Sequence, residues 1–229
     1  MIKTIDIIIP VYNEENTLET VIKKIEETDF CNLEKKIILV DDKSTDKSKD
    51  ILQKYPQHTI IFKDKNEGKG SAVWAGIKAG SGDIIIIQDA DLEYNPQDYQ
   101  IILPYIINEE ESVVYGSRLK NNNIKSFMYL SYLANIFLTF LTNLLFRCNI
   151  TDMETCYKAF RRDTINDITI KSKKFEFEVE ITSKITKKGI HIKEVPIYYN
   201  SRTHKSGKKI SWKDGIQAIF AIFYYKFFD

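Results

Sequence analysis

Apolar positions along the first half of the chain follow two alternating patterns. Short stretches rich in isoleucine and valine, such as IDIIIP and DIIIIQD, are typical of strands. They predict strands at residues 5–10, 36–42, 58–64, 83–89 and 112–118. Segments with helical periodicity lie between them, at about 17–28, after 44–46, at 69–79 and from Pro96. Because the strands are apolar on both faces, this order predicts an α/β fold with a mostly parallel sheet flanked by helices.

Polar residues gather where the predicted strands end. The carboxyl ends of parallel strands share one edge of the sheet, and ligands bind along that edge. The polar clusters are Asn13-Glu14, Asp41-Asp42, Asp89-Asp91 and Ser117-Arg118. We expect one pocket to collect all four.

The isoleucines at 84–87 lead directly into three acids at every second position, Asp89, Asp91 and Glu93. Side chains alternate along an extended chain, so we expect the three carboxylates to point to one side. Such carboxylates repel one another unless a cation lies between them. A few hard oxygen ligands suit Mg²⁺ or Mn²⁺, which also bind substrate phosphates. The alternative is a solvated turn after a strand, where aspartate is common.

Two further segments favour a nucleotide ligand. In VDDKSTD, Asp41 and Asp42 end a strand, where a carboxylate can accept a hydrogen bond from a base or a ribose hydroxyl. Capping of the next helix is the alternative, and both roles can hold. In NEGKGSA, Gly68 and Gly70 flank Lys69 at a helix start, which suits either a phosphate or a close backbone approach. The chain has neither P-loop spacing nor a G-x-G-x-x-G after its first strand, which disfavours ATPase and dinucleotide-binding functions.

Composition and charge narrow the class of protein further. The 229 residues are 43% hydrophobic and carry a net charge of +1, so we expect one domain and no nucleic-acid partner. The N-terminal apolar run reads as a strand and not as a secretion signal. The three cysteines include no C-x-x-C pair, which favours reduced thiols in the cytoplasm. The histidines, His58, His191 and His204, lack ligand spacing.

Residues 126–146 form an uncharged segment long enough to span a membrane. On a helix, however, its polar residues make one stripe beside a wider apolar arc: Ser131, Asn135, Thr139, Thr142 and Asn143. A crossing would also separate Arg118 from Asp152, which we expect at one site. We therefore predict a helix in the membrane interface or packed partly on the domain, with Lys120, Lys125 and Arg147 near lipid headgroups. A buried core helix is the alternative.

The C-terminal segment 216–228 repeats this apolar and aromatic pattern, so we expect a peripheral membrane protein. The basic stretch at 202–209 precedes that segment and contains His204 and Gly207. It is interpreted as a lid over the active site. A solvated turn and a patch for anionic lipid are the alternatives.

Several motifs in order along the chain resemble family-2 inverting glycosyltransferases of the GT-A fold, a nucleotide-diphospho-sugar transferase fold. These motifs are IIPVYNEENTL, VDDKSTD, NEGKGSAVWAGIKAGSGDIIIIQDADLEY and VVYGSR. Four later segments look like the dolichyl- or polyprenyl-phosphate mannose synthase branch: TDMETCYKAFRR, FEFEVEITSKI, IKEVPIYYNSRT and GKKISWKDG. The resemblance implies one glycosyltransferase domain over 1–229. Residues 1–118 would bind nucleotide sugar and metal, and 119–229 would bind the acceptor and include the interfacial helices.

The resemblance also implies roles for individual residues. The family's first nucleotide-binding turn matches Pro10, Tyr12, Asn13 and Glu14, and its nucleoside contact matches Asp42. Asp89 and Asp91 match the pair that binds metal and diphosphate. Glu93 falls where some relatives coordinate with glutamine, and Lys43 where many have glycine. Arg118 matches an arginine that meets the acceptor phosphate. Arg202 and Lys208 fall in a basic segment that closes over the donor diphosphate and the acceptor.

The implied reaction moves a hexose, mannose from GDP-mannose, to a polyprenyl or dolichyl phosphate on the cytoplasmic face of a membrane. Related sequences use UDP-glucose with the same motifs. A lipid phosphate is already anionic and requires no general base. If the acceptor were a glycan hydroxyl in surface polysaccharide synthesis, a carboxylate such as Asp152 would have to take a proton. Asp152 and Glu154 are therefore the pair that discriminates between the two acceptors, and plain hydrogen bonding at a helix end is the alternative role for both. An inactive membrane-associated relative is the third possibility, and the intact Asp89-Asp91 pair weighs against it.

Overall fold

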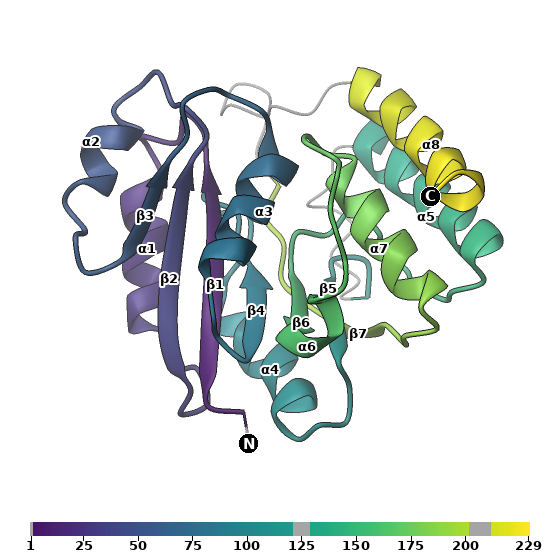
Figure 1. Cartoon of the computed structure of the whole chain (residues 1–229), viewed down its shortest axis with the longest axis horizontal. Helices are drawn as coiled ribbons and strands as arrows, with labels where there is room; N and C mark the ends of the chain where they lie inside the picture. Colours follow the sequence, from purple (N-terminus) through teal and green to yellow (C-terminus); the bar gives the residue numbers. More distant parts are fainter. Residues whose placement is uncertain (1, 121–128, 202–211) are drawn as a thin grey trace.

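The computed structural model describes residues 2–120, 129–201 and 212–229, and these residues form a seven-stranded sheet with the order β3-β2-β1-β4-β6-β5-β7 (Figure 1). Six strands run parallel and β6 runs antiparallel to both of its neighbours. The strands are β1 (Thr4–Val11), β2 (Glu34–Asp41), β3 (Thr59–Phe62), β4 (Ile84–Ile87), β5 (Val113–Ser117), β6 (Lys158–Arg161) and β7 (Lys193–Pro196). The predicted α/β fold with a mostly parallel sheet is confirmed.

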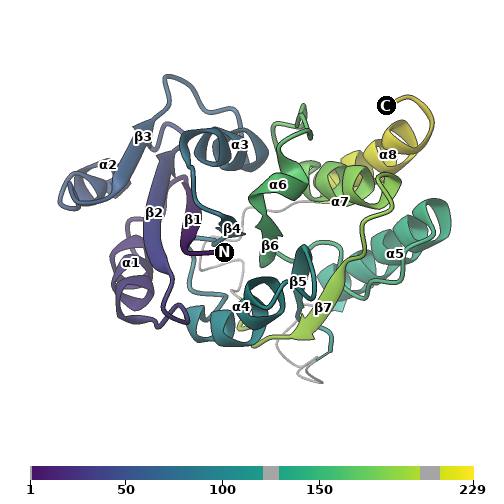
Figure 2. The ribbon, with the colours of Figure 1, turned by 60° about the horizontal axis from the view of Figure 1, so that its bottom comes forward.

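Helices cover both faces of the sheet. Figure 2 shows α1 and α4 on one face and α3 with α7 on the other, while α5 and α8 lie side by side beyond β5 and β7. The larger helices are α1 (Leu18–Glu27), α3 (Lys69–Ala79), α4 (Tyr99–Ile107), α5 (Tyr129–Phe146), α7 (Phe177–Lys187) and α8 (Trp212–Phe227). The short ones are α2 (Ser48–Leu52), η1 (Pro96–Asp98) and α6 (Arg162–Ile165). Between these layers the isoleucines of β1 and β4 are fully buried, as their two-sided apolar pattern predicts.

The reversed direction of β6 decides which residues reach the functional edge of the sheet. The parallel strands β1, β2, β4 and β5 deliver their carboxyl ends to that edge. Because β6 is antiparallel, the segment that precedes it, residues 152–157, arrives at the same edge. The sequence pattern did not predict β6 or β7.

The amino end of α3 approaches the segment before α7 very closely. The backbone N–H of Gly70 donates to the carbonyl of Lys174 at 3.2 Å, and that of Ser71 to Lys173 at 2.9 Å. A Cβ at Gly70 would lie 2.7 Å from the Lys174 carbonyl and 2.7 Å from Cβ of Phe177. These amides are therefore used within the protein, so the close-approach interpretation of the glycine pair is confirmed.

Gly70→Ala is expected to lower the free energy of unfolding by about 1–3 kcal/mol, because the backbone atoms it meets cannot move aside. Gly215→Ala is the control, since an added Cβ there meets nothing within 4 Å. Urea denaturation of both variants measures the difference. Equal stabilities would contradict the close packing of α3 on the 172–177 segment.

The apolar arc of α5 faces outward and its polar stripe faces inward. Asn135, Thr139 and Thr142 are buried, whereas the outward residues are exposed: Leu130, Leu133, Ile136, Phe137, Phe140 and Leu144. α8 exposes Phe220, Phe223 and Phe227 beside them. The alternative of a buried core helix is therefore wrong. Within the described ranges, no helix has the length and apolarity needed to cross a membrane.

Candidate active site

A cavity of about 1110 Å³ lies at the carboxyl ends of β1, β2, β4 and β5. It collects predicted site residues from every one of these strands: Pro10, Tyr12, Glu14, Asp42, Lys69, Asp89, Asp91, Glu93 and Arg118. The predicted common pocket is therefore present. Asn13 does not line it, because its side chain bonds Thr45 in the next loop. Arg202, Lys208 and His204 lie outside the described residues, as does Lys125.

The loop after β2 is organised by its two aspartates. Asp41 accepts from the backbone N–H of Ser44 within the loop, four residues before α2 begins, so it does not cap that helix. Asp42 is buried and accepts from Lys63 Nζ at 2.6 Å and from the backbone N–H of Gly68 at 2.6 Å. It thereby fastens the loop before α3 to the pocket wall. Lys43 has φ of +65°, the left-handed region that favours glycine, which accounts for the glycine that many relatives have there.

The acidic segment after β4 forms a turn. The strand ends at Ile87, and Leu92 has φ of +61°. The alternation expected for an extended chain is therefore wrong. Glu93 accepts from the Tyr199 hydroxyl at 2.8 Å, and Asp91 accepts from the backbone N–H of Glu93. Across the described ranges, no three Asp, Glu, His or Cys side chains are grouped to hold a metal ion, so the expected three-carboxylate group is not formed.

Beneath this turn, Lys69 joins two acids from distant parts of the chain. Its Nζ lies 2.9 Å from Asp89 Oδ1 and 3.2 Å from Glu178 Oε1. Burial alone would lower the pKa of this ammonium group, but Asp89 and Glu178 raise it well above its usual value. On its other side, Glu178 pairs with Lys158, which is fully buried. Lys69 is thus a permanent cation directly beside Asp89.

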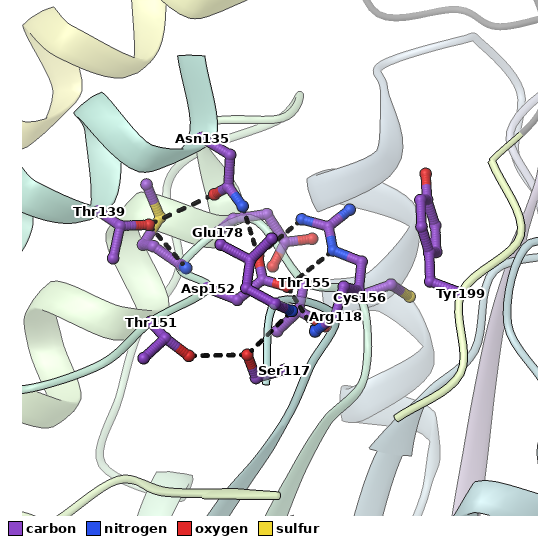
Figure 3. Close-up of polar contacts among 12 residues, drawn as sticks. Ser117, Arg118, Asn135, Thr139, Thr151, Asp152, Thr155, Cys156, Glu178 and Tyr199 are labelled. Carbon is purple, nitrogen blue, oxygen red and sulfur yellow. Dashed lines mark hydrogen bonds and ion pairs between the residues drawn. The ribbon is translucent and has the colours of Figure 1, made fainter. Parts of the chain in front are cut away.

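Arg118 is held in a fixed orientation in the cavity wall. Asp152 accepts from Arg118 Nε at 2.8 Å, from Nη2 at 2.7 Å and from its backbone N–H at 2.9 Å, and Asn135 Nδ2 donates to Asp152 at 2.8 Å (Figure 3). The other face of the guanidinium lies 5.0 Å from the Tyr199 ring centre. The contacts with Asp152 and Tyr199 therefore fix the orientation of the Arg118 guanidinium group.

Asp152 has no exposed surface and is saturated by these donors. Burial opposes its charged form, but Arg118 and Asn135 hold its pKa below the usual value. Asp152 is therefore a positioning group for Arg118, and proton removal by it is disfavoured.

Sequence reasoning assigned no role to Glu178 or Tyr199, although both line the cavity. The segment FEFEVE alternates apolar residues with three acids, Glu176, Glu178 and Glu180. Acids within an apolar segment could have indicated buried ion pairs at this position. Nothing in the local pattern around Tyr199 distinguishes it from a core aromatic.

The mostly parallel sheet, with a pocket at the carboxyl ends of its strands, is of the GT-A class of fold. Residues 6–169 match the family described as Glycosyl transferase family 2. The chain therefore belongs to glycosyl transferase family 2 and is a glycosyltransferase, which confirms the resemblance of its motifs.

Two relatives are similar along most of this chain. A UDP-N-acetylglucosamine–dolichyl-phosphate N-acetylglucosaminyltransferase of Methanococcus voltae is 29% identical over 217 residues, covering 85% of each protein. A dolichol-phosphate mannosyltransferase of Pyrococcus furiosus is 26% identical over 210 residues, covering 89% of this chain and 58% of that protein.

Among solved structures, glucosyl-3-phosphoglycerate synthase from Mycobacterium tuberculosis, in complex with Mn²⁺, UDP and phosphoglyceric acid, superposes with a TM-score of 0.75. It is 19% identical, and the match covers 99% of this chain and 80% of that one. At this identity the likeness establishes the shared fold.

Proposed function

We propose that this protein transfers a hexose, with inversion, from a nucleotide sugar to a polyprenyl or dolichyl phosphate. One observation carries the proposal: the cavity that contains Asp89, Asp91 and Arg118 extends to α5 and α8, which contribute mostly apolar residues to its wall. The apolar lining residues are Leu130, Phe137, Leu138, Ile216 and Ile219. A charged pocket that is continuous with a mostly apolar channel suits an acceptor that has a phosphate head and a hydrocarbon tail. The names of the two dolichyl-phosphate relatives support this acceptor.

In this proposal the donor would bind mainly to residues 1–118 and the acceptor mainly to 119–229, with Arg118 at the junction of the two. Pro10, Tyr12 and Asp42 line the end where a nucleoside would bind. GDP-mannose is the first candidate donor. UDP-glucose and UDP-N-acetylglucosamine are the others, because the structural neighbour holds UDP and one relative is named for a UDP sugar.

Asp89 and Asp91 fit a divalent cation, Mg²⁺ or Mn²⁺, that takes most of its ligands from the donor diphosphate. Two carboxylates with hard oxygens are a sufficient protein contribution for such an ion. When bound, the ion would stabilise negative charge on the departing phosphate. Glu93, engaged by Tyr199, would support the turn and is a weaker candidate ligand.

The chain's own side chains account for the rest of the chemistry. Lys69, beside Asp89, adds a fixed positive charge near the diphosphate, where negative charge grows as the sugar leaves. Arg118, clamped by Asp152, would orient the acceptor phosphate for attack on the anomeric carbon. The attacking phosphate is anionic, so no proton has to be removed.

A direct assay tests the function. Purified protein is given radiolabelled GDP-mannose, UDP-glucose or UDP-N-acetylglucosamine, with polyprenyl phosphate and Mg²⁺ or Mn²⁺. Label that moves into the organic phase with one donor supports the proposal. Label that enters only a water-soluble glycan would overturn the lipid acceptor in favour of a hydroxyl acceptor, and no transfer at all would favour an inactive relative.

The exposed faces of α5 and α8 would rest on the cytoplasmic face of a membrane, which is the peripheral location we propose. The described cysteines are free, consistent with the reducing cytoplasm.

The double variant Phe140→Glu with Phe220→Glu is expected to weaken vesicle binding by at least about tenfold, because both rings are more than 60% exposed on α5 and α8. Phe62→Glu, an exposed ring on β3, is the control. Co-sedimentation with anionic vesicles measures the effect, and equal binding by both would contradict this orientation.

A further inference from the structure

Three cations in or beside the cavity wall have carboxylate partners, in the pairs Lys69–Asp89, Lys158–Glu178 and Arg118–Asp152. Glu154 also lines the cavity, yet within the described ranges it has no ion pair, and its Oε1 is buried without a hydrogen-bond partner. A buried polar atom left unsatisfied is costly, so such an atom beside a ligand cavity indicates a missing ligand group.

Glu154 lies in the cavity wall near charged residues of both proposed anion-binding parts of the cavity. The charges that act on its carboxyl group include Glu178, which contacts the Lys69–Asp89 pair, and Arg118 at the acceptor end. In the proposed reaction the diphosphate binds near Asp89, and the acceptor phosphate binds near Arg118. The group that must occupy the space between them is the hexose itself.

The environment of Glu154 favours its neutral form. Burial first, and the negative charge of Glu178 second, raise its pKa to about 7, while Lys158 and Arg118 oppose the shift. A neutral carboxyl group both donates and accepts a hydrogen bond. A sugar hydroxyl does the same, so the two groups are complementary without a net charge at the site.

We propose that Glu154 forms a hexose-binding subsite, in which its carboxyl group bonds hydroxyl groups of the transferred sugar and helps select the donor. This inference rests on the proposed function. It assigns Glu154 to the sugar, whereas Asp89, Asp91 and Lys69 would hold the diphosphate. Glu154 therefore affects a nucleotide sugar but not the bare nucleotide.

Calorimetry with wild type, Glu154→Ala and Glu154→Gln tests the subsite, using UDP, GDP, UDP-glucose, UDP-N-acetylglucosamine and GDP-mannose with Mn²⁺. Glu154→Ala is expected to lower the affinity for the nucleotide sugar that wild type binds by about tenfold, because it removes the hydrogen-bond partner of the sugar. Its affinity for UDP and GDP should stay within about twofold of wild type. Glutamine keeps one donor and one acceptor, so it should retain turnover and alter the preference among the three sugars. Glu176→Gln is the control, because Glu176 also has a buried oxygen without a partner but lies in a separate surface pocket.

Unchanged affinity of Glu154→Ala for the nucleotide sugar would overturn the subsite and leave the proposed function standing. Equal weakening of sugar and bare nucleotide would also overturn it, since that pattern reports general damage. Loss of turnover in Glu154→Gln with unchanged sugar affinity would make Glu154 a base instead. If wild type bound none of the three nucleotide sugars, the proposed function and this inference would both fail.

Discussion

Asp91→Ala is expected to lower metal-dependent turnover by about a thousandfold, the scale on which groups that stabilise transition-state charge act. Asp91 lines the cavity on the turn after β4 and, with Asp89, supplies the carboxylates proposed for the metal. Asp89 also pairs with Lys69, so the proposed cation would depend on Asp91 as well. Removal of Asp91 would leave that cation with one of its two proposed protein carboxylates.

Binding and folding measurements separate this effect from damage to the fold. In wild type, Mn²⁺ or Mg²⁺ should strengthen the binding of GDP or UDP, and in Asp91→Ala that dependence should disappear. The thermal midpoint should change little, because Asp91 is only half-buried and lies on a turn at the cavity surface, outside the hydrophobic core. Asp50→Asn, an exposed acid on α2, is the control and should behave as wild type. Full activity of Asp91→Ala would defeat the metal assignment.

The elements that could be predicted from the sequence are those in which local signals agree. α3 has the predicted bounds because glycines bracket it, with Gly68 before it and Gly80 after it. β1 and β4 are continuous apolar runs buried on both faces. β6 and β7 could not be predicted, since each has four residues and two of them are charged. Lys158 is acceptable inside the sheet only because Glu178, which is distant in sequence, neutralises it.

The composition of the site was predictable, but its geometry was not. The rule that ligands bind at strand ends placed nine predicted residues around one cavity. The left-handed backbone at Leu92 then turned Glu93 toward Tyr199, which no alternation pattern anticipates. Asp152 and Glu154 are only two positions apart, yet Arg118 and Asn135 saturate the first, while one oxygen of the second finds no hydrogen-bond partner among the described residues. That difference depends on three-dimensional neighbours from β5, α5 and α7.

Asp152→Ala is expected to lower the free energy of unfolding by about 3–5 kcal/mol, because it leaves the Arg118 guanidinium buried without its counter-ion. It also removes the hydrogen-bond acceptor of Asn135, which couples α5 to the cavity wall. Urea denaturation measures the loss. The control is Asp163→Ala, which breaks a second Arg–Asp pair with Arg161. Asp163 is 62% exposed, so that change should cost under about 1 kcal/mol.

The pH dependence of this stability difference shows whether Asp152 is a positioning group for Arg118 or a catalytic base. The folded-state pKa of Asp152 is lowered, so its stabilising contribution is present above the unfolded-state pKa of about 3.9 and is lost as pH falls through the folded-state value. The difference between wild type and Asp152→Ala should therefore be constant from about pH 5 to 8 and shrink only in stronger acid. A difference that changed near neutral pH would instead require a raised pKa. Asp152 would then be available to accept a proton from a hydroxyl acceptor, which would favour transfer to a glycan over transfer to a lipid phosphate.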